Sequence, residues 1–252
     1  MAIIDNTIKS IKKKFPCLGS AKRKIAIMIS PRDPVYVFHH IPKCGGTSVR
    51  EVLHSWFIIF YDYRRRGTLD YPEKVDLNSW RSAHCLCGHF EMDGYYLHQR
   101  YPEVFISNRF KVFTFVRDPL QVQLSLFRYE KKYGVNKTEH IEEHLFLRPN
   151  YIAHRLLATM DNYREVIDRY FFVGILENGQ ASLDLLADII GKPRHSLPWK
   201  NRTQNTLESR SSTNNLSEEL VERFRSDSAL DYLIYNYCVE KLQKMLAEHD
   251  AL

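Results

Sequence analysis

A lysine and two adjacent glycines stand between a strand-like run and a helix-like run in the segment His40–Ser48, which reads His-Ile-Pro-Lys-Cys-Gly-Gly-Thr-Ser. Glycines let the backbone approach an anion closely, and the free N–H groups that begin a helix carry the positive end of its dipole. The lysine adds a full positive charge, and the last two residues add hydroxyl groups. The segment therefore predicts a phosphate-binding loop made of Lys43, Cys44, Gly45, Gly46, Thr47 and Ser48.

The flanking runs predict the elements that hold this loop. Val35–His39 is rich in β-branched and aromatic residues and predicts a buried strand, and Val49–Phe57 has the apolar spacing of a helix. Lys43 precedes the glycines, whereas the Walker loop places its lysine after them, so a Mg²⁺-dependent nucleoside triphosphatase is disfavoured. An ordinary strand-to-helix turn with two glycines is the simpler alternative.

The residues Ile41–Ser48 resemble the 5′-phosphosulfate loop of sulfotransferases, in particular the carbohydrate sulfotransferases similar to heparan sulfate 2-O-sulfotransferase. The resemblance implies a single α/β domain with a central, mainly parallel sheet flanked by helices, as in the P-loop nucleotide-kinase-like sulfotransferase fold. It implies that the donor is 3′-phosphoadenosine 5′-phosphosulfate (PAPS), that the product is the desulfated nucleotide PAP, and that no metal is required. Cys44 stands where many relatives have threonine or alanine, a difference that leaves its backbone N–H available.

A second element is then required for the 3′-phosphate, and the relatives build it from a strand that ends in arginine and a helix that carries a serine. Lys111–Val116 predicts a buried strand that ends at Arg117, and Asp118 with the proline after it predicts the start of a helix that runs to about Tyr133. Ser125 lies eight positions after Arg117, the spacing of the 3′-phosphate pair in the relatives. Without the resemblance, an arginine paired with an aspartate at a strand end and a solvated serine explain these residues equally well.

The spacing of apolar residues along this helix predicts which side faces the core. Leu120, Leu124 and Phe127 form the expected apolar face, so Ser125 points away from it. A planar guanidinium at Arg117 suits a doubly charged phosphate. We therefore expect Arg117 and Ser125 to bind the 3′-phosphate together.

Two histidines and two cysteines crowd into the segment His84–Phe90. In an extended strand Cys85, Cys87 and His89 would share one face but spread over about 13 Å, too wide for three ligands of one zinc ion, although a bent strand could supply a two-ligand half-site. A buried cysteine strand with a packed histidine is a second alternative. The resemblance implies a third, because the Gly-His segment of the relatives supplies the catalytic base, and it favours His89 over His84, His39 and His40.

The later part of the chain extends the resemblance. Tyr170–Glu177 predicts a strand, and Ser182–Ile190 predicts a helix. Asn201–Gln204 falls where the relatives place a basic, hydroxyl-bearing loop over the nucleotide, so Arg202 and Thr203 are expected donor ligands. A solvated loop is the simpler interpretation of this segment.

The composition is that of one enzyme domain. The chain has 252 residues, 44% of them hydrophobic and 13% aromatic, which is enough for a substantial core. Strand candidates that alternate with helical runs predict a parallel sheet with helices on both faces, within a domain that spans residues 35–252. Two helices are expected in Ser217–His249, the second with an apolar stripe at Leu230, Leu233, Ile234, Tyr237 and Leu242.

The net charge of +6 and the pI of about 9.0 favour anionic partners without identifying them. In a basic N-terminal extension, residues 1–34, a possible helix places Lys9, Lys12, Lys13 and Lys14 beside Ile4, Ile8, Ile11 and Phe15. Such a helix could touch a membrane surface, although a solvated terminal helix is the simpler interpretation. We expect a cytoplasmic protein, because no signal-peptide region or bilayer-spanning run is apparent and the five cysteines lack a regular disulfide spacing.

Together these residues predict direct, in-line sulfuryl transfer to a hydroxyl group. His89 would remove the acceptor's proton, and Lys43 would neutralise the charge that grows on the leaving phosphate. The resemblance favours a carbohydrate or glycolipid acceptor and no nucleic acid, and the aromatic segments Tyr61–Tyr71 and Met92–Tyr101 could line its cleft. Two other classes stay open: a phosphoryl-transfer enzyme, and a non-catalytic module that binds acidic polysaccharide or nucleic acid through Arg64, Arg65 and Arg66. The sequence does not indicate an oligomeric state.

Overall fold

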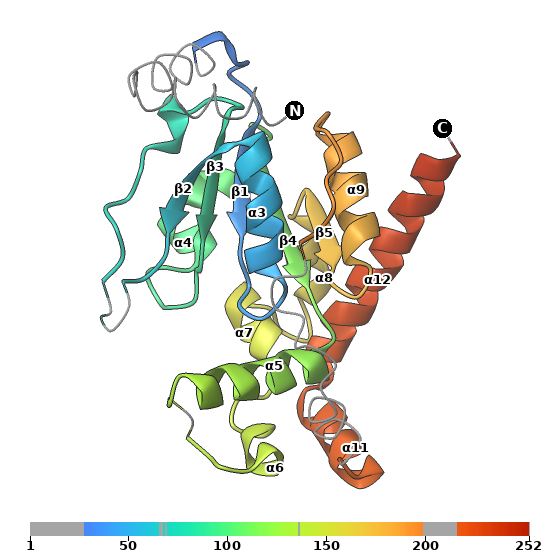
Figure 1. Cartoon of the computed structure of the whole chain (residues 1–252). Helices are drawn as coiled ribbons and strands as arrows, with labels where there is room; N and C mark the ends of the chain where they lie inside the picture. Colours follow the sequence, from blue (N-terminus) through green and yellow to red (C-terminus); the bar gives the residue numbers. More distant parts are fainter. Residues whose placement is uncertain (1–27, 66–67, 69, 136, 199–215, 252) are drawn as a thin grey trace, which may run out of the picture.

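Five strands form one sheet in the computed structural model of the chain, which describes residues 28–65, 68, 70–135, 137–198 and 216–251 (Figure 1). The strands are β1 (Val35–His39), β2 (Ile58–Asp62), β3 (His84–Gly88), β4 (Phe110–Val116) and β5 (Phe172–Ile175). Their order is β2-β3-β1-β4-β5, and every neighbouring pair is parallel. The prediction of an α/β domain with a mainly parallel sheet is confirmed.

Helices cover both faces of this sheet, as right-handed connections between parallel strands require. The helices in the described ranges are α3 (Gly46–Trp56), α4 (Leu97–Arg100), α5 (Pro119–Lys132), α6 (Ile141–His144), α7 (Tyr151–Leu156), α8 (Tyr163–Asp168), α9 (Gly179–Ile189), α11 (Glu218–Asp227) and α12 (Ala229–Asp250), with short 3₁₀ helices η1 (Leu77–Ser79) and η2 (Pro102–Phe105). Of these, α6 and α11 lie below the sheet in Figure 1 and do not cover a face of it. The C-terminal ends of α3 and α9 are joined where the Trp56 indole donates to the Pro193 carbonyl at 2.9 Å. α4 and α8 lie behind the sheet in Figure 1, and α12 packs against β5, α7 and α8.

Three central strands bring the candidate site residues to one edge of the sheet. All residues of β1 and β3 are buried, as expected of parallel strands covered on both faces. The carboxyl ends of parallel strands meet at one edge, where open α/β sheets bind their ligands. That edge receives the loop after β1, His89 after β3 and Arg117 after β4.

Element β2 was not predicted. The helix-like spacing of the sequence runs through Phe57, but α3 ends at Trp56 and the chain turns at once into a strand in which Ile58 pairs with His84. The residues of β2 are β-branched and aromatic, and pairing with β3 completes the edge of the sheet. Tertiary pairing thus decides the structure where the local spacing is ambiguous.

Helix α5 begins as predicted but turns a different face to the core. The Asp118 carboxylate accepts from the Gln121 N–H at 2.9 Å, and a proline occupies the first turn. The predicted apolar face was wrong, because only Leu124 of its three residues is buried. The buried face instead includes two polar residues that have partners: Gln123 donates to the Arg148 carbonyl at 2.8 Å, and Glu130 pairs with the Arg148 guanidinium at 2.9 Å.

The two predicted C-terminal helices are present as α11 and α12. The apolar stripe of α12 is partly as expected, since Leu230, Ile234 and Leu242 are buried, with Cys238 in the same row. Leu233 is 36% exposed and does not belong to this face. The long helix therefore uses a narrower stripe than the sequence suggests.

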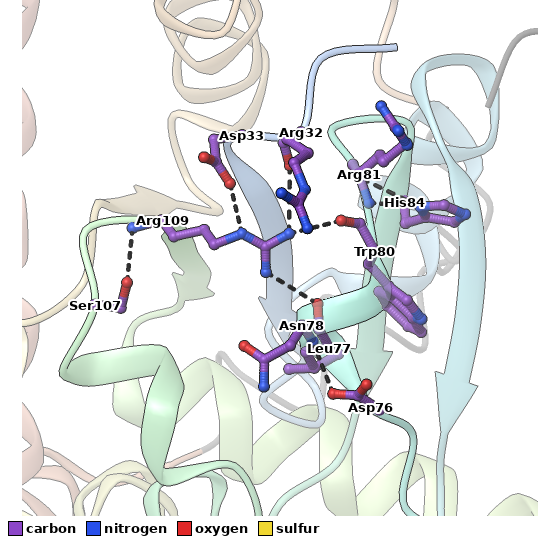
Figure 2. A network of polar contacts seen from close by, with 10 residues as sticks. All are labelled: Arg32, Asp33, Asp76, Leu77, Asn78, Trp80, Arg81, His84, Ser107 and Arg109. Atoms are coloured by element: carbon purple, nitrogen blue, oxygen red, sulfur yellow. Dashed lines mark hydrogen bonds and ion pairs between the residues drawn. The ribbon is translucent and has the colours of Figure 1, made fainter. Parts of the chain in front are cut away.

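The edge of the sheet opposite the candidate site is held by one arginine (Figure 2). The Arg109 guanidinium donates to the carbonyl oxygens of Leu77 at 3.2 Å and Trp80 at 2.7 Å, and it forms an ion pair with Asp33. These partners lie in the segments that lead into β1 and β3, while Arg109 itself leads into β4. One side chain thus fixes the starting points of the three strands whose other ends carry the site.

Within the described ranges, no helix is both long enough and apolar enough to cross a membrane. Residues 1–27 of the basic N-terminal extension lie outside these ranges, so its contact with a membrane stays a prediction.

Candidate functional site

The loop after β1 needs both of its glycines, for different reasons. Gly45 has a φ of 79°, in the left-handed region, and a Cβ there would overlap the side chain of Leu176. A Cβ on Gly46 would overlap the imidazole of His40. Lys43 also has a positive φ, 70°, which costs a non-glycine residue about 1 kcal/mol. Strain of this kind collects at functional sites, so the loop conformation is held against a local preference.

The start of α3 presents free N–H groups. The Ser48 N–H donates to the Gly45 carbonyl at 2.9 Å, and the Cys44 N–H donates to the Ile41 carbonyl at 3.4 Å. Within the described residues, no acceptor is present for the N–H groups of Gly45, Gly46 and Thr47. These three donors lie at the positive end of the helix dipole and form an anion site. The site has fewer free N–H groups than the loop residues Cys44–Ser48 expected from the sequence.

Three cations gather beside this loop. Arg117 Nη1 donates to the Lys43 carbonyl at 3.4 Å, and Arg117 Nε lies 3.8 Å from the Glu177 carboxylate, buried and without a hydrogen bond in the described part of the chain. Burial, followed by the charges of Arg117 and Arg128, lowers the pKa of Lys43 to about 8. Burial and Arg117 likewise lower the pKa of Arg128. Burial is the main cause of both shifts and repulsion between the cations adds to them, so an anion bound here would stabilise the charged forms.

His89 lines the same cleft as Lys43 and is a neutral imidazole. Burial, followed by the charges of Arg155, Arg50 and Arg64, lowers the pKa of His89 to about 4. The ring contacts His40, with Nε2 of His89 3.2 Å from Nδ1 of His40. At neutral pH the side chain is therefore unprotonated and able to accept a proton.

The same nitrogen of His40 also contacts Tyr63, and this second contact indicates where the proton of His40 lies. His40 Nδ1 is 2.8 Å from the Tyr63 hydroxyl, which is 3.0 Å from the Cys87 sulfur. One N–H can be shared by two acceptors, whereas one ring lone pair can receive only one proton. The geometry therefore favours a protonated His40 Nδ1 that donates to Tyr63 and, more weakly, to His89 Nε2. The long bond to His89 leaves Nε2 available to a substrate proton.

Lys43, Thr47, His40 and His89 line one cleft of about 620 Å³. Aromatic and charged residues from distant segments complete it: Arg50, Tyr63, Arg64, Glu91, Tyr129, Glu130, Arg148, Tyr151 and Arg155. Glu91 lies 3.4 Å from Arg155. The cleft places an anion-binding loop and a neutral base around one space, an arrangement able to transfer a charged group to a hydroxyl.

Other predicted site residues, Arg117 among them, do not line this cleft. Cys44 is buried, and burial raises the pKa of its thiol to about 12, so only its backbone belongs to the loop. Ser125 is half-buried on α5, and among the described contacts no hydrogen bond joins it to Arg117. Arg202 and Thr203 lie outside the described residues.

The cysteines of β3 are buried thiols. Burial raises the pKa of the Cys87 thiol to about 12, and that of Cys85 rises well above its ordinary value. Zinc binds the thiolate, which this environment disfavours. In the part of the chain that the structure describes, no three His, Cys, Asp or Glu side chains are grouped to hold a metal ion.

Arg155 and Arg128 were not predicted as site residues, and Tyr63 was predicted only within the segment Tyr61–Tyr71 that could line the acceptor cleft. Arg155 comes from α7, which the sequence pattern did not predict, and Tyr63 follows the unpredicted strand β2. Arg128 lies three positions after Ser125, so the helix spacing could have indicated it once Ser125 was a candidate.

Comparisons with known proteins support the fold. No known protein family matches the sequence, and no curated protein matches it. Among solved structures, a sulfotransferase from Alicyclobacillus acidocaldarius is similar over 82% of this chain and 96% of its own, at a TM-score of 0.50 and 13% identity. Mouse sulfotransferase SULT7A1 complexed with PAP is similar over 82% of this chain and 90% of its own, at a TM-score of 0.46 and 12% identity. The chain thus has the fold of the bacterial sulfotransferase.

Proposed function

We propose that the protein transfers a sulfuryl group from PAPS to a hydroxyl group of a carbohydrate or glycolipid and releases PAP. The observation that carries the proposal is the cleft that Lys43, clustered with Arg117 and Arg128, shares with the neutral imidazole of His89. A donor with phosphates at both ends of its ribose fits such a cluster, because the buried Nε of Arg117 has no hydrogen bond in the described residues. The fold shared with a solved sulfotransferase agrees with this chemistry.

In this proposal the protein binds and orients the donor and neutralises the charge of its phosphates. The free N–H groups of Gly45, Gly46 and Thr47 hold the 5′-phosphate together with Lys43, and Arg117 holds the 3′-phosphate with help from Ser125 and from Arg202 and Thr203. The donor supplies an activated sulfuryl group. Loss of one preorganised donor of this kind costs about 10² to 10³ in turnover in enzymes that stabilise an oxyanion.

His89 accepts the proton of the acceptor hydroxyl at Nε2, while His40 keeps its own proton on Nδ1, which donates to the Tyr63 hydroxyl. A pKa of about 4 makes His89 a weak base in the free protein. Negative charge that enters the cleft offsets the arginines around the imidazole and raises its pKa toward the working pH, where a general base is more effective. Burial and, to a smaller extent, the arginines thus keep the base unprotonated until anionic substrate arrives.

The test has a binding arm and a transfer arm. Calorimetry should show that PAP binds more tightly than ATP with Mg²⁺, and that Arg117→Met weakens PAP binding. Radiolabelled PAPS should then label a member of a panel of oligosaccharides, glycolipids and phenols, with His89→Ala as the blank. Tighter binding of ATP with Mg²⁺ would point to phosphoryl transfer instead, and label transfer by the His89→Ala protein would remove that residue from catalysis.

A further inference from the structure

A second cavity, of about 300 Å³, lies on the other side of His39 and Arg155 from the catalytic cleft. Its walls come from α4, η2, α7 and α8, and we call it the α7–α8 cavity. Its wall combines apolar side chains, among them Leu97, Phe105, Leu156 and Val166, with polar ones. Its volume is at the lower end of the roughly 300 to 1,000 Å³ that small-molecule sites span. The cavity is large enough for one or two fused rings.

The polar groups on its wall are basic or neutral. Arg155, Arg169, His98 and Asn162 line it, and no carboxylate does so among the described residues. The buried His39 adds no charge, because burial and the nearby His89 and Arg155 lower its pKa to about 3, and its Nδ1 is held by the Tyr170 hydroxyl at 2.7 Å. The charged side chains that line the cavity are therefore the two arginines, which are positive.

Both arginines have hydrogen-bonding capacity to spare. Arg155 Nη1 donates to the Tyr151 carbonyl at 3.0 Å and Nη2 reaches Glu91 only at 3.4 Å, while Nε is buried with no hydrogen bond in the described part of the chain. Arg169 pairs with Glu165 on the surface, where both side chains are about half exposed or more. Exposed pairs of this kind contribute about 0 to 1 kcal/mol and exchange partners readily. A buried guanidinium N–H without a partner calls for an acceptor.

We propose that the α7–α8 cavity binds a small monoanion with an aromatic or branched aliphatic body, whose acidic group pairs with Arg155 or Arg169. Small-molecule sites combine apolar surface with a few convergent polar groups, and this cavity has side chains of both kinds. Arg155 also lines the catalytic cleft, so the ligand is either the tail of the acceptor or a separate small acid beside the active site. Binding itself does not depend on the proposed transferase function; only the distinction between these two sources rests on it.

Calorimetry of the whole chain with 2-naphthoate tests the site, with 2-naphthylmethanol as a neutral ligand of the same ring system. Naphthoate is expected to bind saturably below about 5 mM and at least about tenfold more tightly than the alcohol. Val166→Trp fills the cavity and should weaken naphthoate at least tenfold, and Arg169→Met should weaken it several-fold. Arg225→Met removes a comparable exposed, ion-paired arginine on α11 and should change nothing.

Thermal melting checks that the variants fold, and Leu157→Trp at the cavity rim replaces Val166→Trp if the latter is unfolded. Absence of saturable binding to the parent protein, or equal affinity in the folded cavity-filling variant, would overturn the proposal. Naphthoate should still bind when PAP is saturating, whereas displacement by PAP would place it in the catalytic cleft and refute the second site. Label transfer from PAPS to 6-hydroxy-2-naphthoate identifies the ligand as an acceptor tail, and binding without transfer identifies a separate ligand. A protein that binds naphthoate but not PAP would keep this site and lose the proposed function.

Discussion

Binding of PAP should make Lys43 take up a proton. The pKa of Lys43 is about 8 because the side chain is buried near Arg117 and Arg128, so about half of the molecules carry an uncharged Lys43 at pH 8. A phosphate charge about 4 Å from Nζ contributes roughly 4 kcal/mol at an effective dielectric constant of 20, which corresponds to about three pKa units. In the complex the pKa is then near 11 and the amine is fully protonated. Binding at pH 8 therefore takes up about half a proton.

The same reasoning gives the dependence on pH. Uptake should be about one tenth of a proton at pH 7 and about nine tenths at pH 9, and affinity should fall up to about tenfold for each unit above pH 8. Phosphate groups contribute little at pH 8 and above, since their second pKa is about 6, whereas at pH 7 the protons they release offset the small uptake by Lys43. Calorimetry in two buffers with different enthalpies of ionisation measures the number of protons directly.

Two variants separate Lys43 from other sources of protons. Lys43→Met should remove the uptake, and Arg128→Met should reduce it at pH 8 because the pKa of the free lysine rises when a neighbouring charge is lost. If the parent protein binds PAP without proton uptake at pH 8, or if the uptake survives in Lys43→Met, the electrostatic description of the cluster is wrong.

Three further predictions follow from single contacts. Because the pKa of His89 is about 4, kcat/KM should show no protonation of the base between pH 7 and pH 5 and should fall only near pH 4, whereas a limb near 6.5 would contradict the shielding by arginines. Gly46→Ala should displace the His40 ring and lower turnover by about 10² while PAP affinity changes less than tenfold; unchanged turnover would show that the His40 contact is dispensable. Arg109→Met should lower the free energy of unfolding by about 2 to 3 kcal/mol, seen as a fall in Tm of roughly 6 °C, with unchanged PAP affinity.

The parts of the fold that depend on local chemistry were predictable. Strands β1 and β4, the loop glycines and the Asp118 cap follow from composition and spacing within a few residues, and the loop and Arg117 meet because parallel strands end at one edge. The buried face of α5 was not predictable, because Gln123 is acceptable in the core only through its bond to the Arg148 carbonyl, 25 residues away. The sequence pattern around Gln123 gives no indication of such a distant partner.

The position of Arg155 was even less predictable from the sequence, because it depends on a helix at the other end of the chain. The Asp231 carboxylate of α12 accepts from the N–H groups of Ile152 at 3.0 Å and Ala153 at 2.8 Å, and so holds the first turn of α7. Both oxygens are occupied across a separation of 78 to 79 residues, while burial raises the pKa of this carboxyl to about 6. A charge buried at such a cost is stable only where its acceptors are satisfied, so the α7–α12 contact fixes one geometry. The guanidinium between the two cavities is therefore positioned by tertiary structure alone.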